Sequence, residues 1–598
     1  MFAAKTALIA TLATLVSAVA ALGQEEVLRH VYDKAGGTRI EIESLFGTAA
    51  RHGALPFRIT IRNNTGKDRA WTVTFREGHP GRKLTTESTY RFEVENASEV
   101  RHEVVFHFAP AFAAYDYRNL AVEVSAPGLR DVSRNAGQQT NQSFPMLAIS
   151  KPLARRSLAA LDDHLEKQNS NNHFFAKPFE PDALPSDWLG YTGLDFFLVD
   201  LDSWNNLQSS QRQAVISWVR LGGNLEVYTE TGETIGDLGL PGGNRQEASA
   251  TQATLSLGRV RVQEWNGSEL PTALVGHYSS HRTRDQELEG YYGTDWPLQE
   301  SLESKDFNAA VIFALLVGFA VLVGPVNLFY FAKSGRRHRL FVTTPVISVA
   351  ACLVVVVFIL LKDGVGGQGL RVVFADLQPT PGEMRLYTSQ EQVSRTGVMV
   401  DPGFEADRRL GLAPVNLPES AYNPLSPRNR RTTTYEIEGP VFRGGLFRSR
   451  SEQGFVVCAA EPTRARIEIT APSSEGSPPR LVSSLASPIG EFYYLDTDAR
   501  LWKSPPGTTV APGSAIPLEP ADRNAFEAWL RRETSGFSRP LAERIARLGS
   551  EADRFFALPD DDSAFPLPTH PSLDWENRAV LLSGSPLPRN PATLSSDE

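Results

Sequence analysis

Two long uncharged runs dominate the middle of this 598-residue chain. Ala309 to Ala332 (24 residues) and Leu340 to Leu361 (22 residues) contain no acidic or basic side chain. As α-helices that rise about 1.5 Å per residue, both are long enough to cross a hydrocarbon core of about 30 Å. Only seven residues separate them. The sequence therefore predicts an antiparallel two-helix hairpin through a membrane.

The turn between the two runs is basic. It contains Lys333, Arg336, Arg337 and Arg339, and basic residues close to the ends of membrane spans are retained in the cytoplasm. The turn is therefore predicted to be cytoplasmic. Both long flanks of the hairpin are then expected on the opposite side of the membrane.

The amino terminus predicts the same orientation. Residues 1–23 carry one positive charge, Lys5, followed by an apolar run and then small residues up to Gly23. This is the layout of a secretory signal peptide, cleaved after Ala20 or Gly23, with an uncleaved third helix as the alternative. Either case places most of the chain outside the cytoplasm.

The amino-acid composition limits the cellular compartments and the classes of partner that fit this chain. The hydrophobic content of 41% is that of a globular protein, and the net charge of −9 provides no basic field for nucleic acid. The two cysteines, Cys352 in the second run and Cys458 far beyond it, are not expected to pair. These features favour a multi-pass protein of the bacterial inner membrane with periplasmic domains, whose first partner is the lipid bilayer.

Residues 24–145 alternate apolar and polar side chains in short segments. Leu55 to Asn63, for example, places its apolar side chains on one face, and period two is typical of half-buried β-strands. Six or seven such segments in about 120 residues predict an immunoglobulin-like β-sandwich. His102 and His107 point to opposite faces of one strand, so they are expected to be structural residues and not metal ligands.

Residues 146–306 alternate strands and helices. Ser210 and Gln213 have capping-box spacing, and Gly222 with Gly223 ends a helix. The strand–helix–strand order predicts a parallel sheet in a three-layer, flavodoxin-like α/β domain. The expected elements are a helix over Pro152–Gln168, a strand over Leu194–Asp200, a helix over Ser210–Leu221 and a strand over Asn224–Tyr228.

Three stretches of this region form a recognisable set: Trp188-Leu-Gly-Tyr-Thr-Gly-Leu-Asp195, the strand ending at Asp200, and Trp218-Val-Arg-Leu-Gly-Gly223. They resemble the core of class I glutamine amidotransferase-like domains. Degenerate domains of this kind are similar to those of uncharacterised exported bacterial membrane proteins with a Gly-Pro-bearing span, here Gly324-Pro325-Val-Asn327. Active amidotransferases need a cysteine nucleophile and a histidine base, but residues 146–306 contain no cysteine. The resemblance implies the fold without the amidotransfer chemistry.

Two pairs of residues are the candidate ligands of this domain. Asp200 and Asp202 follow the carboxyl end of a predicted strand, where open α/β sheets place ligands. They are interpreted either as substrate or metal ligands or, preferably, as capping and loop residues. His277 and His281 have a spacing that suits zinc on a helix, but their surroundings show no helical pattern and no third ligand. No metal and no cofactor is therefore predicted.

Inside the hairpin, Pro325 and Pro345 lie at similar depth. Asn327 is level with Thr343 and Thr344, which predicts a hydrogen bond across the hairpin where lipid offers none. This polar level is interpreted either as a packing lock or as a docking notch for another membrane protein. Neither run contains a charge, so an ion path is not expected.

The segments that flank the hairpin are assigned by composition. Tyr291, Tyr292 and Trp296 suit the outer membrane interface, and Gly364 to Gly369 reads as a glycine-rich linker. Beyond the linker, residues 362–515 predict a β-rich exported domain. Residues 516–598 predict helices over Ala521–Arg532 and Leu541–Phe556 and a loose tail.

The sequence thus predicts a multi-domain α+β membrane protein. No nucleophile elbow, phosphate loop or zinc motif is present, which favours a non-catalytic protein that binds or scaffolds another envelope component. The alternatives are an accessory subunit of a transporter complex and a hydrolase or transferase that uses the α/β carboxylates. The predicted parts are a signal peptide (1–23), the sandwich (24–145), the α/β domain (146–306), the spans (307–332 and 340–361), their turn (333–339), the β-rich domain (362–515) and the helical carboxyl-terminal region (516–598).

Overall fold

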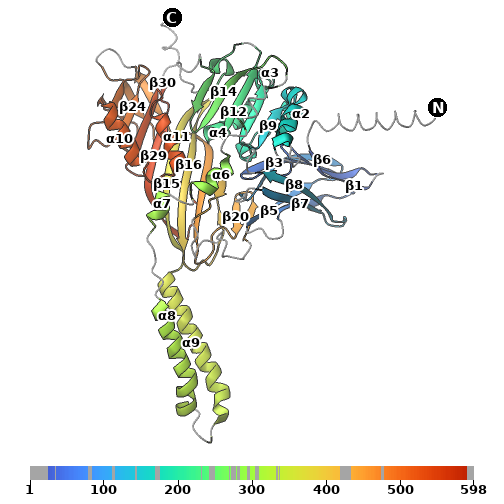
Figure 1. Cartoon of the computed structure of the whole chain (residues 1–598), viewed down its shortest axis with the longest axis vertical. Coiled ribbons are helices and arrows are strands. Elements are labelled where there is room, and N and C mark those ends of the chain that lie inside the picture. The colour runs from blue at the N-terminus through green and yellow to red at the C-terminus, as the bar shows by residue number, and fades with distance from the viewer. Residues whose placement is uncertain are drawn as a thin grey trace, which may run out of the picture.

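The chain folds into a body of several β-sheets with a helical stalk (Figure 1). The structure is a computed structural model. Within its described residues the architecture is α+β, with more strand than helix. The described residues are 25–588 apart from 34–35, 79–83, 111–114, 142–144, 169–175, 231, 241–249, 269, 271–277, 279–282, 293–295, 303–308, 332–334, 336, 418–432 and 473–476.

Two antiparallel sheets at the amino-terminal end of the body pack face to face. The predicted alternation is observed over Thr38–Ser44, where Ile40 and Ile42 are fully buried and Arg39 and Glu41 are partly exposed. The Phe57 and Phe75 rings from the two sheets lie 4.9 Å apart. One sheet has the order β1-β2-β3-β6, and the other contains β5-β4-β7-β8. The strands are β1 (Glu25–Asp33), β2 (Thr38–Ser44), β3 (Ala54–Asn63), β4 (Arg69–Glu77), β5 (Leu84–Val94), β6 (Ser98–His107), β7 (Tyr115–Ser125) and β8 (Val132–Asn141).

Strands from the carboxyl-terminal half extend the second of these sheets. β19 (Thr433–Glu438) pairs in parallel with β5, and β20 (Val441–Gly444) and β17 (Phe404–Glu405) continue the sheet to its edge. The sandwich is therefore built from two distant parts of the chain. A domain boundary drawn along the sequence does not separate these parts in space.

The α/β region forms a six-stranded sheet with the order β10-β9-β11-β12-β14-β13. Its first five strands are parallel and β13 is antiparallel. This confirms the parallel arrangement predicted from the order of elements. The elements are β9 (Leu147–Ser150), α2 (Lys151–Gln168), β10 (Ala176–Phe179), β11 (Phe196–Asp200), α3 (Leu201–Asn205), α4 (Ser209–Arg220), β12 (Asn224–Thr229), β13 (Gln252–Leu255) and β14 (Gly258–Glu264).

Helix α4 begins two residues earlier than the capping motif predicted. Gln208 has an extended backbone, and its N–H donates to Gln211 Oε1 at 3.0 Å. The prediction of a box between Ser210 and Gln213 is therefore wrong. It followed the usual preference for serine at the N-cap, but Gln208 takes that position, and Gln211 closes the capping box in place of Gln213.

A nine-stranded sheet forms the carboxyl-terminal part of the body. Its centre is the long hairpin of β15 (Gly367–Thr380) and β16 (Glu383–Thr396), and α10 (Arg523–Glu533) and α11 (Arg539–Leu548) contribute to a core on this sheet. The other strands are β18 (Gly411–Pro414), β21 (Glu452–Thr463), β24 (Ile489–Leu495), β25 (Leu501–Lys503), β27 (Glu519–Pro520), β28 (Arg554–Pro559) and β29 (Leu573–Gly584). A small fourth region contains β22 (Ile467–Ala471), β23 (Arg480–Ser483), β26 (Ala515–Ile516) and β30 (Leu587–Pro588).

The last predicted helix is too long. It ends at Leu548, and Phe555 and Phe556 lie instead in the buried strand β28. Apolar residues at helical spacing continue past Gly549 in the sequence, so periodicity alone does not mark the change. Pairing of β28 with β24 and β29 decides the conformation.

The stalk projects from the body as two adjacent helical arms (Figure 1). One arm is α8 (Ala309–Val321) followed by the π-helical segment η4 (Leu322–Phe331), and the other is α9 (Leu340–Asp363). In the described part of the chain, one helix, residues 337–358, is long and apolar enough to cross a membrane, and the apolar helix at 316–331 is shorter. The first run is not one continuous α-helix, and a pair of membrane spans is not confirmed.

The predicted glycine linker after α9 is part of the body. Only Gly364, Val365 and Gly366 separate α9 from β15. Gly364 and Gly366 have φ of +76° and +84°, a conformation that favours glycine, and the Gly366 N–H donates to the Val398 carbonyl at 3.0 Å. The glycines make a tight turn and do not form a flexible spacer.

Candidate functional site

The two predicted carboxylates do not form a joint site. Asp200 is buried and caps α3, accepting from Ser203 N at 2.9 Å and from Ser150 Oγ at 2.7 Å. Asp202 is exposed in the first turn of the same helix. This geometry favours the capping role of Asp200 over ligand binding.

The histidines are similarly dispersed. His277 and His281 lie outside the described residues. His102 stacks on Phe92 with ring centroids 4.5 Å apart. Among the residues that the structure describes, no three histidine, cysteine or acidic side chains are grouped so that they could hold a metal ion.

Of the contacts predicted across the hairpin, the hydrogen bond between Asn327 and Thr344 is observed. Asn327 is fully buried, and its Nδ2 donates to Thr344 Oγ1 at 2.9 Å across the two arms. Thr343 Oγ1 instead donates to the Arg339 carbonyl in its own arm, at 3.0 Å. The two prolines lie inside the arms, Pro325 in η4 and Pro345 in α9.

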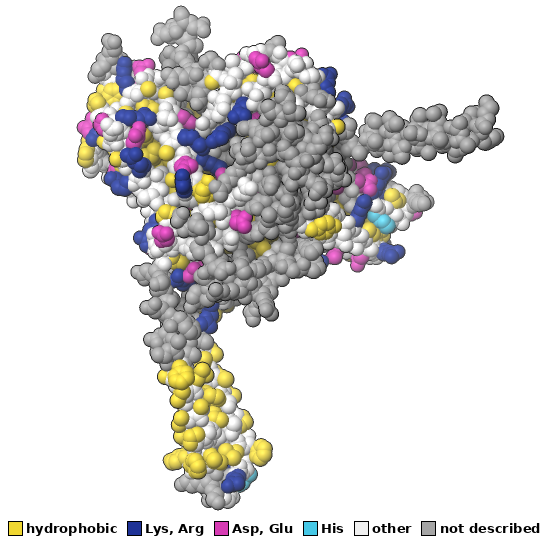
Figure 2. Space-filling model, viewed as in Figure 1, with side chains coloured by type: hydrophobic (Ala, Val, Ile, Leu, Met, Phe, Trp, Pro, Cys, Tyr) yellow, Lys and Arg dark blue, Asp and Glu magenta, His cyan; other side chains and the backbone are white. Residues whose placement is uncertain are grey.

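The end of the stalk away from the body carries exposed basic side chains (Figure 2). Arg337 and Arg339 are exposed there, whereas Lys333 and Arg336 lie outside the described residues. The large apolar side chains of both arms are exposed along the stalk, for example Phe329 at 74% and Phe341 at 86%. Such a contiguous apolar surface is unusual for a protein domain in water.

The aromatic residues before the stalk do not lie at its surface. Tyr292 and Trp296 are each 2% exposed and pack into the core of the carboxyl-terminal sheet. Tyr292 Oη donates to Glu391 Oε1 at 2.8 Å. The prediction that these two side chains meet a membrane interface is therefore wrong, because tertiary packing buries them.

A cavity of about 120 Å³ lies where the sandwich, the α/β sheet and the nine-stranded sheet meet. Its lining also includes α6 (Arg284–Gly290) and α11. The walls combine apolar side chains, among them Trp188 and Trp218, with polar side chains from the sandwich, the α/β region, α6 and α11. A concave site of mixed lining between domains is the usual form of a small-molecule site.

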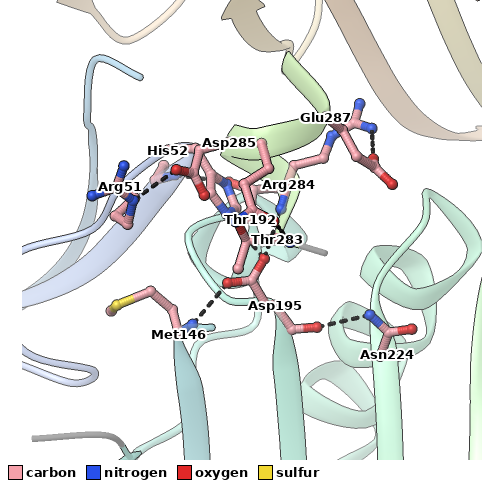
Figure 3. Close-up of polar contacts among 12 residues, drawn as sticks. Arg51, His52, Met146, Thr192, Asp195, Asn224, Thr283, Arg284, Asp285 and Glu287 are labelled. Atoms are coloured by element: carbon pink, nitrogen blue, oxygen red, sulfur yellow. Dashed lines mark hydrogen bonds and ion pairs between the residues drawn. The ribbon is translucent and has the colours of Figure 1, made fainter. Parts of the chain in front are cut away.

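Asp195 is the central polar residue of one wall (Figure 3). It precedes β11, and its carboxylate lies 3.3 Å from His52 Nε2, at the end of the sandwich. It also accepts from the backbone N–H groups of Met146 (2.7 Å) and Arg284 (3.0 Å). Burial alone would raise the pKa of Asp195, but His52 and these N–H groups outweigh burial and hold the pKa below its ordinary value.

A second wall carries two guanidinium groups that share one carboxylate. Arg284 Nη1 lies 2.6 Å from Glu287 Oε2, and Arg544 Nη2 lies 2.7 Å from Glu287 Oε1. Burial opposes the charge of Arg284, but the neighbouring Glu287 carboxylate raises its pKa above the ordinary value. All three side chains line the cavity.

The cavity also contains groups that could suggest catalysis. Cys458 lines it together with His52, but none of the contacts among the described residues joins the two. Burial raises the pKa of the Cys458 thiol, which disfavours the reactive thiolate. His107 also lines the cavity, and burial with the nearby Arg409 lowers its pKa to about 4, so it is neutral at pH 7. The arrangement supports binding more than nucleophilic chemistry.

The sequence pattern does not predict this cavity. The predicted ligands Asp200 and Asp202 lie at the carboxyl end of a parallel strand, whereas Asp195 lies at the amino end of β11. His52 is 143 positions from Asp195, and nothing local to Arg51-His52-Gly53 indicates that partner. The only usable signal is an aspartate directly before an apolar strand, within the stretch that resembles amidotransferase-like domains.

Comparison with known proteins identifies no family. No protein-family model matches the chain, and no curated protein matches it. Similar solved structures include a cycloisomaltooligosaccharide glucanotransferase of Paenibacillus sp. complexed with cycloisomaltoheptaose, with 9% identity and a TM-score of 0.16 over 31% of this chain and 27% of that chain. Another is β-glucuronidase 2 of Bacteroides uniformis, with 9% identity and a TM-score of 0.14 over 34% and 25% of the two chains. The chain spans about a quarter of the length of these structures, and likeness at this level carries no argument about fold or function.

Proposed function

We propose that the chain is a non-catalytic protein of the bacterial inner membrane whose soluble body lies outside the cytoplasm and binds or positions another envelope component. The observation that carries this proposal is the stalk. Its two arms expose apolar side chains along their length while the sheets bury theirs. A lipid bilayer is the solvent that such a surface requires.

Both arms are proposed to cross the bilayer. α8 and η4 together run without a break from Ala309 to Phe331, and their contacts with α9 pair the arms. Since Pro325 lacks an N–H, a π-helical segment around it keeps the arm helical where a regular α-helix is interrupted. If the chain crosses the membrane twice, the segments before and after the stalk lie on the same side of it. This agrees with the pairing of β19 with β5, which joins the two segments in one sheet. The exposed basic tip favours a cytoplasmic turn.

The proposal of a non-catalytic role is based on the chemistry of the candidate reactive groups. The α/β region contains no cysteine, Asp200 is engaged as a helix cap, and Cys458 is a buried thiol of raised pKa. These observations support a binding role over the hydrolase or transferase alternative. They also agree with the proposed kinship to exported membrane proteins that carry a degenerate amidotransferase-like domain.

The topology can be tested by thiol labelling in spheroplasts. Cys352 and Cys458 are replaced by alanine, and single cysteines are placed at the exposed positions Glu95, Arg531 and His338. A membrane-impermeant maleimide is expected to label Glu95→Cys and Arg531→Cys in intact spheroplasts, and His338→Cys only after permeabilisation. The reverse pattern, or labelling of Glu95→Cys without Arg531→Cys, would overturn the proposal.

A second candidate function is an accessory subunit of a transporter complex, and the observation that favours it concerns Asn327. Its Oδ1 is buried and has no hydrogen-bond partner among the described residues, and a polar group in a bilayer needs one. Because Asn327 is fully buried between the arms, a membrane helix of a partner would have to insert between them to supply the donor. Photo-crosslinking from lipid-facing positions of α9, such as Val349 and Leu353 (both 60% exposed), should then capture a discrete membrane protein. Capture of lipid alone would contradict this role.

A further inference from the structure

Two guanidinium groups lie beside one carboxylate at one wall of the cavity. Arg284 and Arg544 share the single carboxylate of Glu287. The other carboxylate in the lining, Asp195, already accepts hydrogen bonds from His52 and two backbone N–H groups. The planar, donor-only guanidinium group can bind more than one carboxylate. The cavity therefore favours an anion beside Arg284 and Arg544.

The same two arginines lie where a ligand could reach them. The side chains of Arg284 and Arg544 are 31% and 20% exposed, whereas His52 and Asp195 are almost fully buried. The guanidinium groups thus stand on the solvent side of the cavity. An incoming anion meets them before it meets the buried Asp195 carboxylate.

Two glycines keep this space open. A Cβ atom at Gly222 would lie 2.9 Å from Arg544 Nη1, and the φ of +117° also favours glycine. A Cβ atom at Gly411 would lie 3.2 Å from the Trp188 ring. Larger residues at either position would press on the groups that line the cavity.

Most of the other side chains that line the cavity are apolar. Trp188, Trp218, Leu221, Leu412 and Val456 all contribute to it. A hydrocarbon or aromatic group is stabilised by such walls in proportion to the area that it buries. The cavity volume of about 120 Å³ limits the occupant to a small molecule.

We propose that this cavity binds a small organic acid, with its carboxylate on Arg544 and Arg284 and its apolar part against Trp188 and Trp218. This goes beyond the proposed anchoring function and does not depend on which way the chain crosses the membrane. The ligand class follows from three properties of the cavity: two partly exposed guanidinium groups that share one carboxylate, a largely apolar lining with two indoles, and a small volume.

The test uses the full chain in mild detergent with benzoate as the probe and benzamide as its neutral isostere. Binding is followed by ligand-observed NMR and by tryptophan fluorescence. Benzoate is expected to bind saturably with a dissociation constant below about 10 mM, and benzamide at least about tenfold more weakly. Failure of benzoate to saturate, or equal binding of benzamide, would overturn the proposal.

Two arginines of α11 provide a matched pair of variants. Arg544→Gln removes one guanidinium from the cavity and is expected to weaken benzoate binding about ten- to hundredfold. Arg547→Gln, one turn further along the same helix and outside the cavity lining, is expected to change binding less than about twofold. Equal effects of the two substitutions would mean that benzoate responds only to the total positive charge of α11, and the proposed site would be wrong.

A third variant separates loss of binding from loss of folding. Ala413 lines the cavity from the short strand β18 and is partly exposed. Ala413→Leu fills the cavity without removing a charge, and is expected to abolish benzoate binding while the circular dichroism spectrum and melting temperature stay close to those of the parent. Undiminished benzoate binding by a folded Ala413→Leu variant would place the ligand elsewhere.

Discussion

Arg51 and Asp285 form a buried ion pair across two parts of the body, with Arg51 Nε 2.7 Å from Asp285 Oδ2 and side chains 2% and 0% exposed. Arg51 follows β2 of the sandwich, and Asp285 lies in the first turn of α6, 234 positions later. Figure 3 shows the pair next to the His52–Asp195 contact. Together they fix the sandwich to α6 and to the α/β sheet at the edge of the cavity.

Breaking this pair on one side should strongly destabilise the body. Asp285→Ala leaves the Arg51 charge buried without its carboxylate, and such a change costs about 3–5 kcal/mol. Urea or thermal unfolding of the full chain should show the loss. Glu543→Ala, which removes the exposed i,i+4 pair with Arg539 on α11, should change stability by less than about 0.5 kcal/mol. A double change, Arg51→Met with Asp285→Leu, should recover much of the loss.

His107 should make the stability of the sandwich dependent on pH. Burial and Arg409 lower its pKa from 6.5 to about 4, so the folded state binds its proton less readily than the unfolded chain. The stabilisation is fully present above pH 6.5 and is lost as the pH falls toward 4. At about 1.4 kcal/mol per pKa unit, it amounts to about 3.5 kcal/mol at most. Melting temperatures of the parent and of His107→Gln, measured between pH 4 and 7, should diverge over this window; parallel curves would refute the assignment.

Glu391 should have the opposite effect. Burial raises its pKa above 4.5 despite hydrogen bonds from Ser538 and Tyr292. The folded state then binds the proton more tightly than the unfolded chain, so this contribution to stability falls as the pH rises above 4.5. Glu391→Gln should remove this dependence, and the difference in melting temperature between parent and variant should shift in favour of the variant from pH 4.5 upward. A difference independent of pH would contradict the raised pKa.

The hydrogen bond across the stalk should stabilise the pairing of its arms. Asn327→Leu and Thr344→Val each remove the bond between Nδ2 and Oγ1, at a cost of about 0.5–1.5 kcal/mol in a membrane. Thr343→Val removes only a bond within one arm and serves as the control. Proximity of the arms can be measured by disulfide crosslinking between introduced cysteines in native membranes. If all three substitutions behave alike, the bond does not lock the stalk.

The sequence predicted those parts of the fold that depend on local pattern. Alternation in β2 specifies a half-buried strand, and the order of β11, α4 and β12 specifies a parallel unit, because burial repeats every two residues in a strand and every three to four in a helix. Capping and helix ends were less accurate. Several side chains can cap a helix, and a buried strand such as β28 has no local pattern that distinguishes it from a helix.

The candidate site was beyond local reasoning for a different reason. Pairing of β19 with β5 and of His52 with Asp195 joins residues that are far apart in the chain, and neither partner specifies the other. Tyr292 and Trp296 illustrate the same limit, since their amphipathic side chains suit a membrane interface and a protein core equally. Only the tertiary structure distinguishes the two environments.

The three-residue turn between α9 and β15 has a mechanical consequence. β15 is an interior strand of the nine-stranded sheet and is hydrogen-bonded on both sides, to β16 and β29. A change in the tilt of α9 is therefore passed to the sheet and is not absorbed in a tether. The tilt of α9 therefore sets the orientation of the nine-stranded sheet. In the proposed bilayer, the cavity opening beside Arg284 and Arg544 would keep a fixed orientation relative to the membrane surface.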